Sequence, residues 1–68
     1  MVIFGERLRE LRLEKGMTQS SLAKLISVDR RTIGNWENDL REPDLETLVK
    51  LVKVLNTNAE FLLGLDIE

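Results

Sequence analysis

The stretch 19–38, QSSLAKLISVDRRTIGNWEN, decides the fold of this 68-residue chain. It contains two short segments with apolar residues at helical spacing, joined by a tight turn at Ser27 and Val28. Two helices with so short a connection pack at about 90–120° only if a side chain at the crossing is small, and Ala23 meets that need. The apolar residues available to a shared core are Leu22, Ile26, Val28, Ile33 and Trp36. The stretch therefore predicts two crossed helices, with Thr18 and Asp29 as N-caps.

Start and stop signals outside this stretch predict three more helices. Apolar residues recur at helical spacing up to Gly16, which predicts a first helix over 3–15. A polar, proline-containing loop over 38–43 precedes Asp44, the expected N-cap of a fourth helix that ends at Asn56. A last helix is expected over 59–63. The apolar face predicted for the fourth helix consists of Leu45, Leu48, Leu51, Val52 and Leu55. No alternation typical of strands is present, so an all-α, five-helix domain over 1–68 is predicted.

The composition excludes several classes of function. The chain has no cysteine and no histidine, so it offers neither a disulfide nor the usual metal ligands, and no cofactor is expected. It also contains no glycine-rich phosphate loop, and its carboxylates are spread along exposed helical faces, so an enzyme is not predicted. Its longest apolar runs are far below the roughly 20 residues that span a bilayer. No membrane partner is predicted, and a cytoplasmic location is expected.

The net charge of −2 disfavours binding to phosphate, but the charge is unevenly distributed. Residues 1–38 hold seven basic and five acidic side chains, a net charge of +2. Residues 39–68 hold three basic and seven acidic side chains, a net charge of −4. One face can therefore be positive although the whole chain is acidic.

Several motifs together resemble the phage-repressor and Cro-like helix-turn-helix domains, the XRE family. They are FGERLRELR at 4–12, the Met17-Thr18-Gln19 start, Ala23 and Val28, TIGNWEN at 32–38, and REPDLETLVKL at 41–51. The resemblance covers almost the whole chain and implies a lambda-repressor-like fold whose helix-turn-helix unit spans about 18–38. It also implies a sequence-specific transcriptional regulator, expected to be a repressor, with double-stranded operator DNA as its partner.

By this resemblance, the helix after Asp29 lies in the major groove and its first residues contact base edges. The positions concerned are Arg30, Arg31, Thr32 and Asn35. Arginine donates two hydrogen bonds to guanine, asparagine pairs with adenine, and threonine offers a methyl group to thymine. Arginines at a helix start oppose the helix dipole, and this local misfit favours a functional role.

The resemblance assigns further residues to the DNA backbone and to the core. Expected phosphate contacts are Thr18, Gln19, Ser20, Asn38 and Arg41, and Thr18 is an N-cap as well. Arg12 and Glu37 occupy positions that pair in relatives as a partly buried ion bridge, which is a structural role. Trp36 is interpreted as a core residue behind the recognition helix.

The chain departs from the family pattern at several positions. Ser27 and Asp39 stand where glycine is common, and a left-handed backbone there costs a non-glycine residue about 1–2 kcal/mol. Gly34 lies inside the recognition helix, where glycine is destabilising by up to about 1 kcal/mol relative to alanine. Leu13, Leu25 and Leu40 stand where polar residues are frequent, and they favour a protein interface if they cluster.

A monomer with few basic residues binds DNA weakly, so a homodimer on a pseudo-palindromic site is expected. Its candidate contact residues are Leu40, Leu65 and Ile67, while Phe61 and Leu62 are interpreted as core. The alternative function is a protein-interaction module, such as a helix-turn-helix antitoxin, which the acidic balance and the unusual leucines favour. The sequence predicts no particular small-molecule effector.

Overall fold

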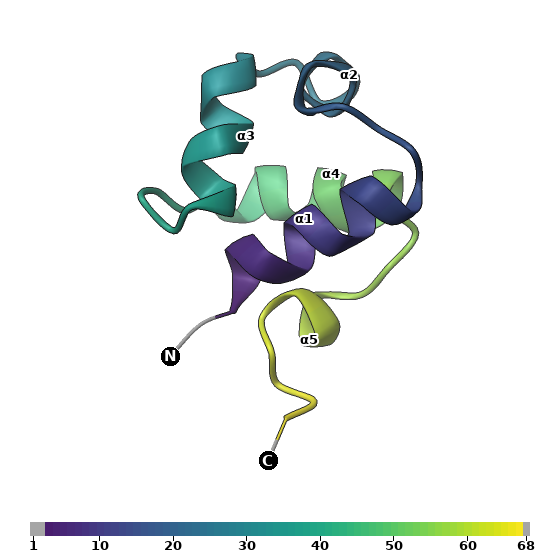
Figure 1. The fold of residues 1–68 in the computed structure, drawn as a ribbon. Coiled ribbons are helices and arrows are strands. Elements are labelled where there is room, and N and C mark those ends of the chain that lie inside the picture. Colours follow the sequence, from purple (N-terminus) through teal and green to yellow (C-terminus); the bar gives the residue numbers. More distant parts are fainter. Residues whose placement is uncertain (1–2, 68) are drawn as a thin grey trace.

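The computed structural model describes residues 3–67, which form five helices. They are α1 (Phe4–Glu14), α2 (Gln19–Leu25), α3 (Arg30–Glu37), α4 (Leu45–Val54) and α5 (Ala59–Leu62). Figure 1 shows α2 and α3 on one side of α1, with their axes steeply crossed, and α5 with the C-terminal end of the chain on the other side. The predicted all-α, five-helix fold is confirmed. Within 3–67, no helix has the length and apolar character needed to cross a membrane.

The predicted domain spans 1–68, and its residues 1, 2 and 68 lie outside the described part of the chain. Each predicted helix is present, with ends that agree to within one or two residues.

Four helices begin with a side chain that accepts a hydrogen bond from a free N–H of the first turn. These caps are Thr18, Asp29, Asp44 and Asn58, as their residue types predict. Thr18 forms a reciprocal pair with Ser21, because the Ser21 hydroxyl also accepts from the Thr18 N–H at 2.9 Å. At the start of α4, the Thr47 side chain and backbone N–H, with the Lys50 charge, hold the pKa of the Asp44 carboxyl below its usual value.

All five helices end with a residue in the left-handed region. These residues are Gly16, Ser27, Asp39, Asn56 and Gly64, with φ between 51° and 75°. The N–H of the following residue then donates to a carbonyl of the last helical turn, as Val28 does to Ala23 at 2.9 Å. The left-handed backbone expected at Ser27 and Asp39 is therefore present. Both residues adopt it although this conformation is less favourable for them than for glycine.

All five helices contribute side chains to one core. Its fully buried side chains are Leu8, Leu22, Ile33, Leu51, Leu55 and Leu62. Trp36 is buried behind α3, as predicted. Leu45 belongs to the predicted apolar face of the fourth helix, but its side chain is 81% exposed. It lies in the first turn of α4, where the helix emerges from the loop after Pro43.

Two further contacts fix the N-terminal part of α1. A Cβ atom on Gly5 would lie 2.5 Å from the carbonyl oxygen of Trp36, so only glycine allows α1 to approach the end of α3 this closely. Arg7 donates to the Phe61 carbonyl at 2.8 Å and to Asp66 at 2.9 Å, and its guanidinium lies 4.0 Å from the centre of the Phe61 ring. Together these contacts hold α3 and the C-terminal segment on opposite sides of α1.

Candidate nucleic-acid interface

The candidate base-contacting residues all lie on α3. Arg30 and Arg31 occupy its first two positions and are exposed. Thr32 follows them, and Asn35 lies about one turn further on, both partly exposed. Behind them, Ile33 and Trp36 are buried and fix the helix to the core. The four residues thus lie together on one helix that is packed against the core.

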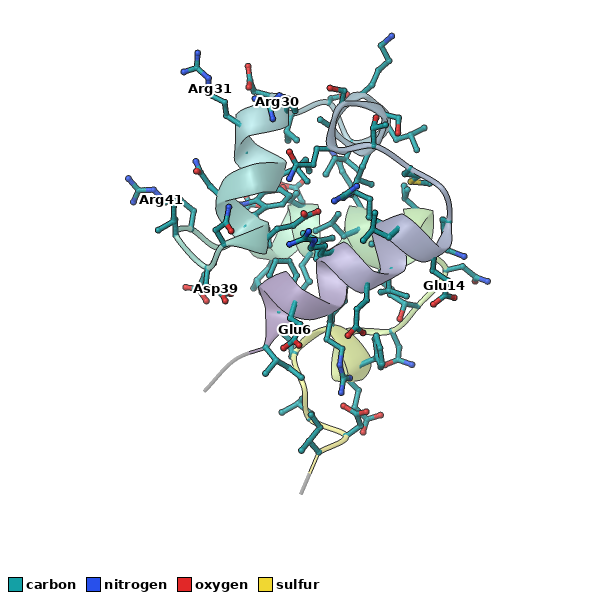
Figure 2. The ribbon with its side chains drawn as sticks, in the orientation of Figure 1. Glu6, Glu14, Arg30, Arg31, Asp39 and Arg41 are labelled. Atoms are coloured by element: carbon teal, nitrogen blue, oxygen red, sulfur yellow. The ribbon has the colours of Figure 1, made fainter. Side chains whose placement is uncertain are left out.

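Asp29 offsets the unfavourable placement of two arginines at the positive end of a helix. Its carboxylate accepts a hydrogen bond from the Arg31 N–H at 2.8 Å, so a negative charge caps the helix dipole. The helix can therefore begin with Arg30 and Arg31 while their guanidinium groups remain at the surface (Figure 2).

The ion pair expected between Arg12 and Glu37 is present and joins α1 to the end of α3. Arg12 Nε donates to Glu37 Oε2 at 2.6 Å, and its second nitrogen donates to Oε1 at 3.1 Å. Arg12 also donates to the Met17 carbonyl at 2.8 Å. The Arg12 side chain is 9% exposed and the Glu37 side chain 4%. The two charges are therefore paired with each other and largely shielded from water.

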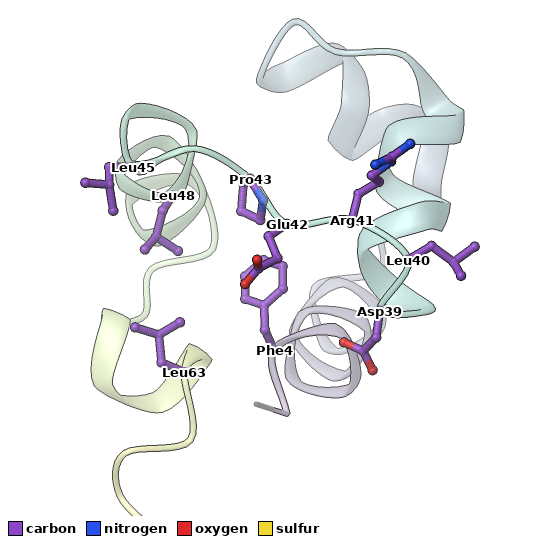
Figure 3. Close-up of a pocket in the computed structure, with 9 residues that line it drawn as sticks. All are labelled: Phe4, Asp39, Leu40, Arg41, Glu42, Pro43, Leu45, Leu48 and Leu63. Atoms are coloured by element: carbon purple, nitrogen blue, oxygen red, sulfur yellow. The ribbon is translucent and has the colours of Figure 1, made fainter. Parts of the chain in front are cut away.

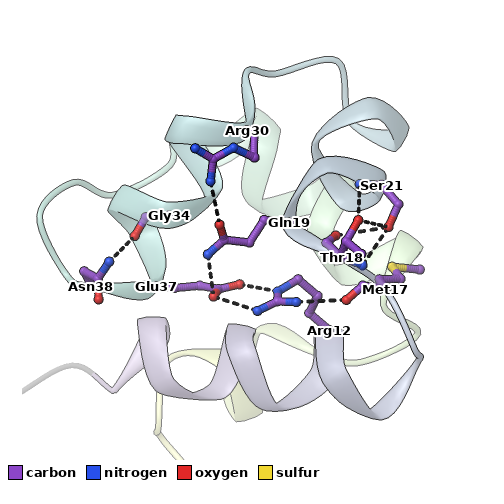
Figure 4. Close-up of polar contacts among 9 residues, drawn as sticks. All are labelled: Arg12, Met17, Thr18, Gln19, Ser21, Arg30, Gly34, Glu37 and Asn38. Atoms are coloured by element: carbon purple, nitrogen blue, oxygen red, sulfur yellow. Dashed lines mark hydrogen bonds and ion pairs between the residues drawn. The ribbon is translucent and has the colours of Figure 1, made fainter.

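Gln19 connects this buried pair to the start of α3, a link that the sequence analysis missed (Figure 4). Its side-chain nitrogen donates to Glu37 Oε1 at 3.2 Å, and its side-chain oxygen accepts from Arg30 at 3.1 Å. The residue types at 19 and 30 could have suggested such a pair, but its formation depends on the crossing of α2 and α3.

The remaining candidate phosphate contacts border α2 and α3. Thr18 caps α2, Ser20 is exposed in its first turn, and Arg41 is exposed in the loop after α3. The Asn38 side chain donates one hydrogen bond to the Gly34 carbonyl at 2.9 Å, which leaves a second N–H of its amide for another acceptor.

Basic and acidic side chains both lie near α3. Figure 2 shows Arg31 and Arg41 projecting outward from α3 and the loop that follows it. Arg30 lies at the start of α3 with its guanidinium turned toward Gln19. Of the labelled carboxylates, Glu6 and Glu14 lie along α1, and Asp39 lies in the turn directly after α3. The exposed guanidinium groups at the start of α3 and in the loop after it would attract an anionic partner to this side.

A shallow groove lies between the loop after α3 and the start of α4 (Figure 3). Apolar side chains line much of it, among them Phe4, Leu40, Leu48 and Leu63. The candidate dimer residues Leu40, Leu65 and Ile67 are all more than half exposed. Leu13 and Leu25 are exposed as well, at 57% and 58%.

The chain belongs to the helix-turn-helix family, whose model matches residues 8–62. It is 39% identical over 62 residues to the HTH-type transcriptional regulator ImmR of Bacillus subtilis (strain 168), a match that covers 91% of this chain and 49% of ImmR. The predicted resemblance to phage repressors is confirmed by the solved structures. The P22 c2 repressor in complex with a synthetic operator matches with a TM-score of 0.89 at 33% identity, over 97% of this chain and all of that one.

The restriction-modification controller protein C.AhdI from Aeromonas hydrophila matches with a TM-score of 0.81 at 41% identity, over 90% of this chain and 92% of that one. By contrast, this chain spans about half the length of the curated relatives that it matches in sequence, ImmR among them. The shared part is the helix-turn-helix domain itself.

Proposed function

We propose that the protein is a sequence-specific DNA-binding transcriptional regulator of the repressor type, with α3 as its recognition helix. The observation that carries this proposal is the likeness of the chain, over 97% of its length, to an operator-bound phage repressor. The exposed arginines at the start of α3 support it, because they supply positive charge and guanine-specific donors at the same place.

In this proposal, Arg30, Arg31, Thr32 and Asn35 contact base edges in the major groove. The backbone is held by Thr18, Gln19 and Ser20 on one side of the groove and by Asn38 and Arg41 on the other. Because the Gln19 side chain is already bonded to Arg30 and Glu37, its phosphate contact is assigned to its backbone N–H.

We further propose that two copies bind a pseudo-palindromic operator in the cytoplasm, with half-sites about one helical turn apart. The exposed apolar side chains of Leu40, Leu65 and Ile67 are the proposed contact surface between the copies. Leu65→Lys is then expected to weaken binding to a two-half-site operator while leaving binding to a single half-site unchanged. An equal loss of affinity for both DNAs would contradict the assignment of these residues to the contact between the copies.

Selection of preferred DNA from a random pool tests the main proposal. The selected sites should share a sequence with two-fold symmetry, and the logarithm of the affinity should fall linearly with the logarithm of salt concentration, by about 0.9 per neutralised phosphate. Arg41→Ala should weaken all DNA sequences alike and lower this slope by about 1. DNA binding without sequence preference or salt dependence would overturn the proposal and favour the protein-interaction alternative.

A further inference from the structure

The carboxylate of Asp29 uses only one of its two oxygens inside the protein. Its Oδ1 atom accepts a hydrogen bond from the Arg31 N–H at 2.8 Å and thereby caps α3. No basic side chain within residues 3–67 forms an ion pair with Asp29, although two arginines follow it directly in the chain. Because Asp29 is exposed, its second oxygen is a charged acceptor at the surface, at the start of the proposed recognition helix.

Arg31 carries donors that are equally unused. Its backbone N–H is bonded to the Asp29 carboxylate, but its guanidinium has no hydrogen bond to another residue in the described part of the chain. Figure 2 shows this guanidinium projecting outward from α3. The start of α3 therefore presents an acceptor and a set of donors on two residues whose positions are linked by a hydrogen bond.

This combination matches the pattern that a G·C base pair shows in the major groove. Guanine presents two acceptors, N7 and O6, and cytosine presents the donor of its N4 amino group next to them. An arginine donates to the guanine atoms, and a carboxylate accepts from the cytosine amino group. An A·T pair has its donor between two acceptors instead, so the same two side chains do not fit it.

The charge of Asp29 has a consequence that capping alone does not require. Serine and asparagine cap helices about as well as aspartate, so the cap does not need a carboxylate. A negative charge close to phosphate groups weakens binding to every DNA sequence. Part of this loss is recovered where the carboxylate meets a donor on a base, and none is recovered where it meets acceptors. A carboxylate at this position therefore increases the difference in affinity between sequences.

We propose that Asp29 is a specificity-determining residue, whose free carboxylate oxygen accepts a hydrogen bond from the N4 amino group of a cytosine. This cytosine belongs to the G·C base pair whose guanine Arg31 contacts. The inference rests on the proposed function, because it requires α3 to lie in the major groove. It adds to the base-contacting residues one that the sequence predicted only as an N-cap.

Asp29→Asn tests the proposal, because asparagine keeps the cap and reverses the group that faces outward. The amide oxygen must accept from the Arg31 N–H, which leaves the NH₂ group, a donor, in place of the free carboxylate oxygen. The urea midpoint should stay nearly unchanged. The preference for G·C over the other base pairs should fall by about five- to tenfold at the position where Arg31→Ala also relaxes it.

Asp44→Asn is the matched control, because Asp44 caps α4 in the same way and the substitution changes the net charge equally. It should leave the base preference unaltered at every position. An Asp29→Asn variant that binds all sequences more tightly and keeps its selectivity overturns the proposal, since Asp29 then acts only by repulsion. Relaxed preference at a different base pair, or at none, overturns it as well. In each case, wild-type binding that is still sequence-dependent leaves the proposed function intact; its absence in the wild type removes both.

A modified operator tests the same contact in the wild-type protein. N4-methylcytosine still pairs with guanine, but a methyl group replaces the amino hydrogen that faces the major groove. At the base pair contacted by Arg31, this base should weaken wild-type binding by about five- to tenfold and Asp29→Asn binding by much less. Unchanged wild-type affinity, or an equal loss in both proteins, would contradict the contact.

Discussion

Removal of Arg12 is expected to destabilise the protein more than most single substitutions. Arg12→Met retains much of the apolar volume of the side chain but deletes three hydrogen bonds, two of them to Glu37. The Glu37 carboxylate, 4% exposed, then keeps only the Gln19 amide as a side-chain partner. Breaking a buried ion pair in this way costs about 3–5 kcal/mol.

This loss is large compared with the stability of so small a domain. Proteins are stable by about 0.05–0.15 kcal/mol per residue, which amounts to roughly 3–10 kcal/mol here. With a urea dependence near 1 kcal/mol per molar, the unfolding midpoint of Arg12→Met should fall by about 3–5 M. The variant is therefore expected to be partly unfolded even without urea.

Urea unfolding followed by circular dichroism and by the fluorescence of Trp36 measures the effect. Trp36 is the single tryptophan and is 4% exposed, so its emission reports loss of the core. The control is the double variant Arg12→Met, Glu37→Leu, in which no charge is left unpaired. It should recover most of the lost stability, because apolar replacement of a whole buried pair is often neutral. An Arg12→Met midpoint within about 0.5 M of the wild type, or a double variant weaker than the single one, would refute the reasoning.

Three smaller effects on stability are also expected. Gly34→Ala should raise the free energy of unfolding by about 0.8–1 kcal/mol, because the backbone there is helical and the added Cβ meets no close atom; a lower urea midpoint would contradict this. Ser27→Gly should raise the free energy of unfolding by about 1 kcal/mol, because φ at Ser27 is 59°, in the left-handed region that favours glycine. An unchanged urea midpoint would contradict strain at this turn. Asp44→Ala should lower stability at neutral pH. Because the pKa of Asp44 is lowered in the folded state, its contribution is full above about pH 4 and declines as the pH falls through the folded pKa. The difference between wild-type and Asp44→Ala midpoints should therefore shrink in acid, and a constant difference would contradict the assignment.

The elements predicted from sequence were those that local chemistry determines. Thr18, Asp29, Asp44 and Asn58 cap helices through bonds to N–H groups two or three residues away. Such bonds depend only on residue type and spacing, so a single sequence is sufficient to predict them.

The features that were missed depend on how helices meet in space. Leu45 fits the apolar periodicity of α4, but periodicity does not tell where the neighbouring helices end. Gly5 looks unremarkable inside α1, yet it lies against the backbone of Trp36. Arg7 bonds to residues 54 and 59 positions away. None of these contacts leaves a pattern in the local sequence.

The hydrogen bond from Gln19 also changes how the Arg12–Glu37 pair is understood. Considered for stability alone, a buried ion pair has little advantage over apolar residues of the same size, because desolvation offsets most of the attraction. An apolar pair, however, would leave the Gln19 amide without an acceptor and free to rotate away from Arg30. The double variant that restores stability should therefore still have weakened selectivity at the base pair contacted by Arg30. This double variant would then have near-normal stability but reduced base selectivity. A purely structural role for the Arg12–Glu37 pair does not predict that result.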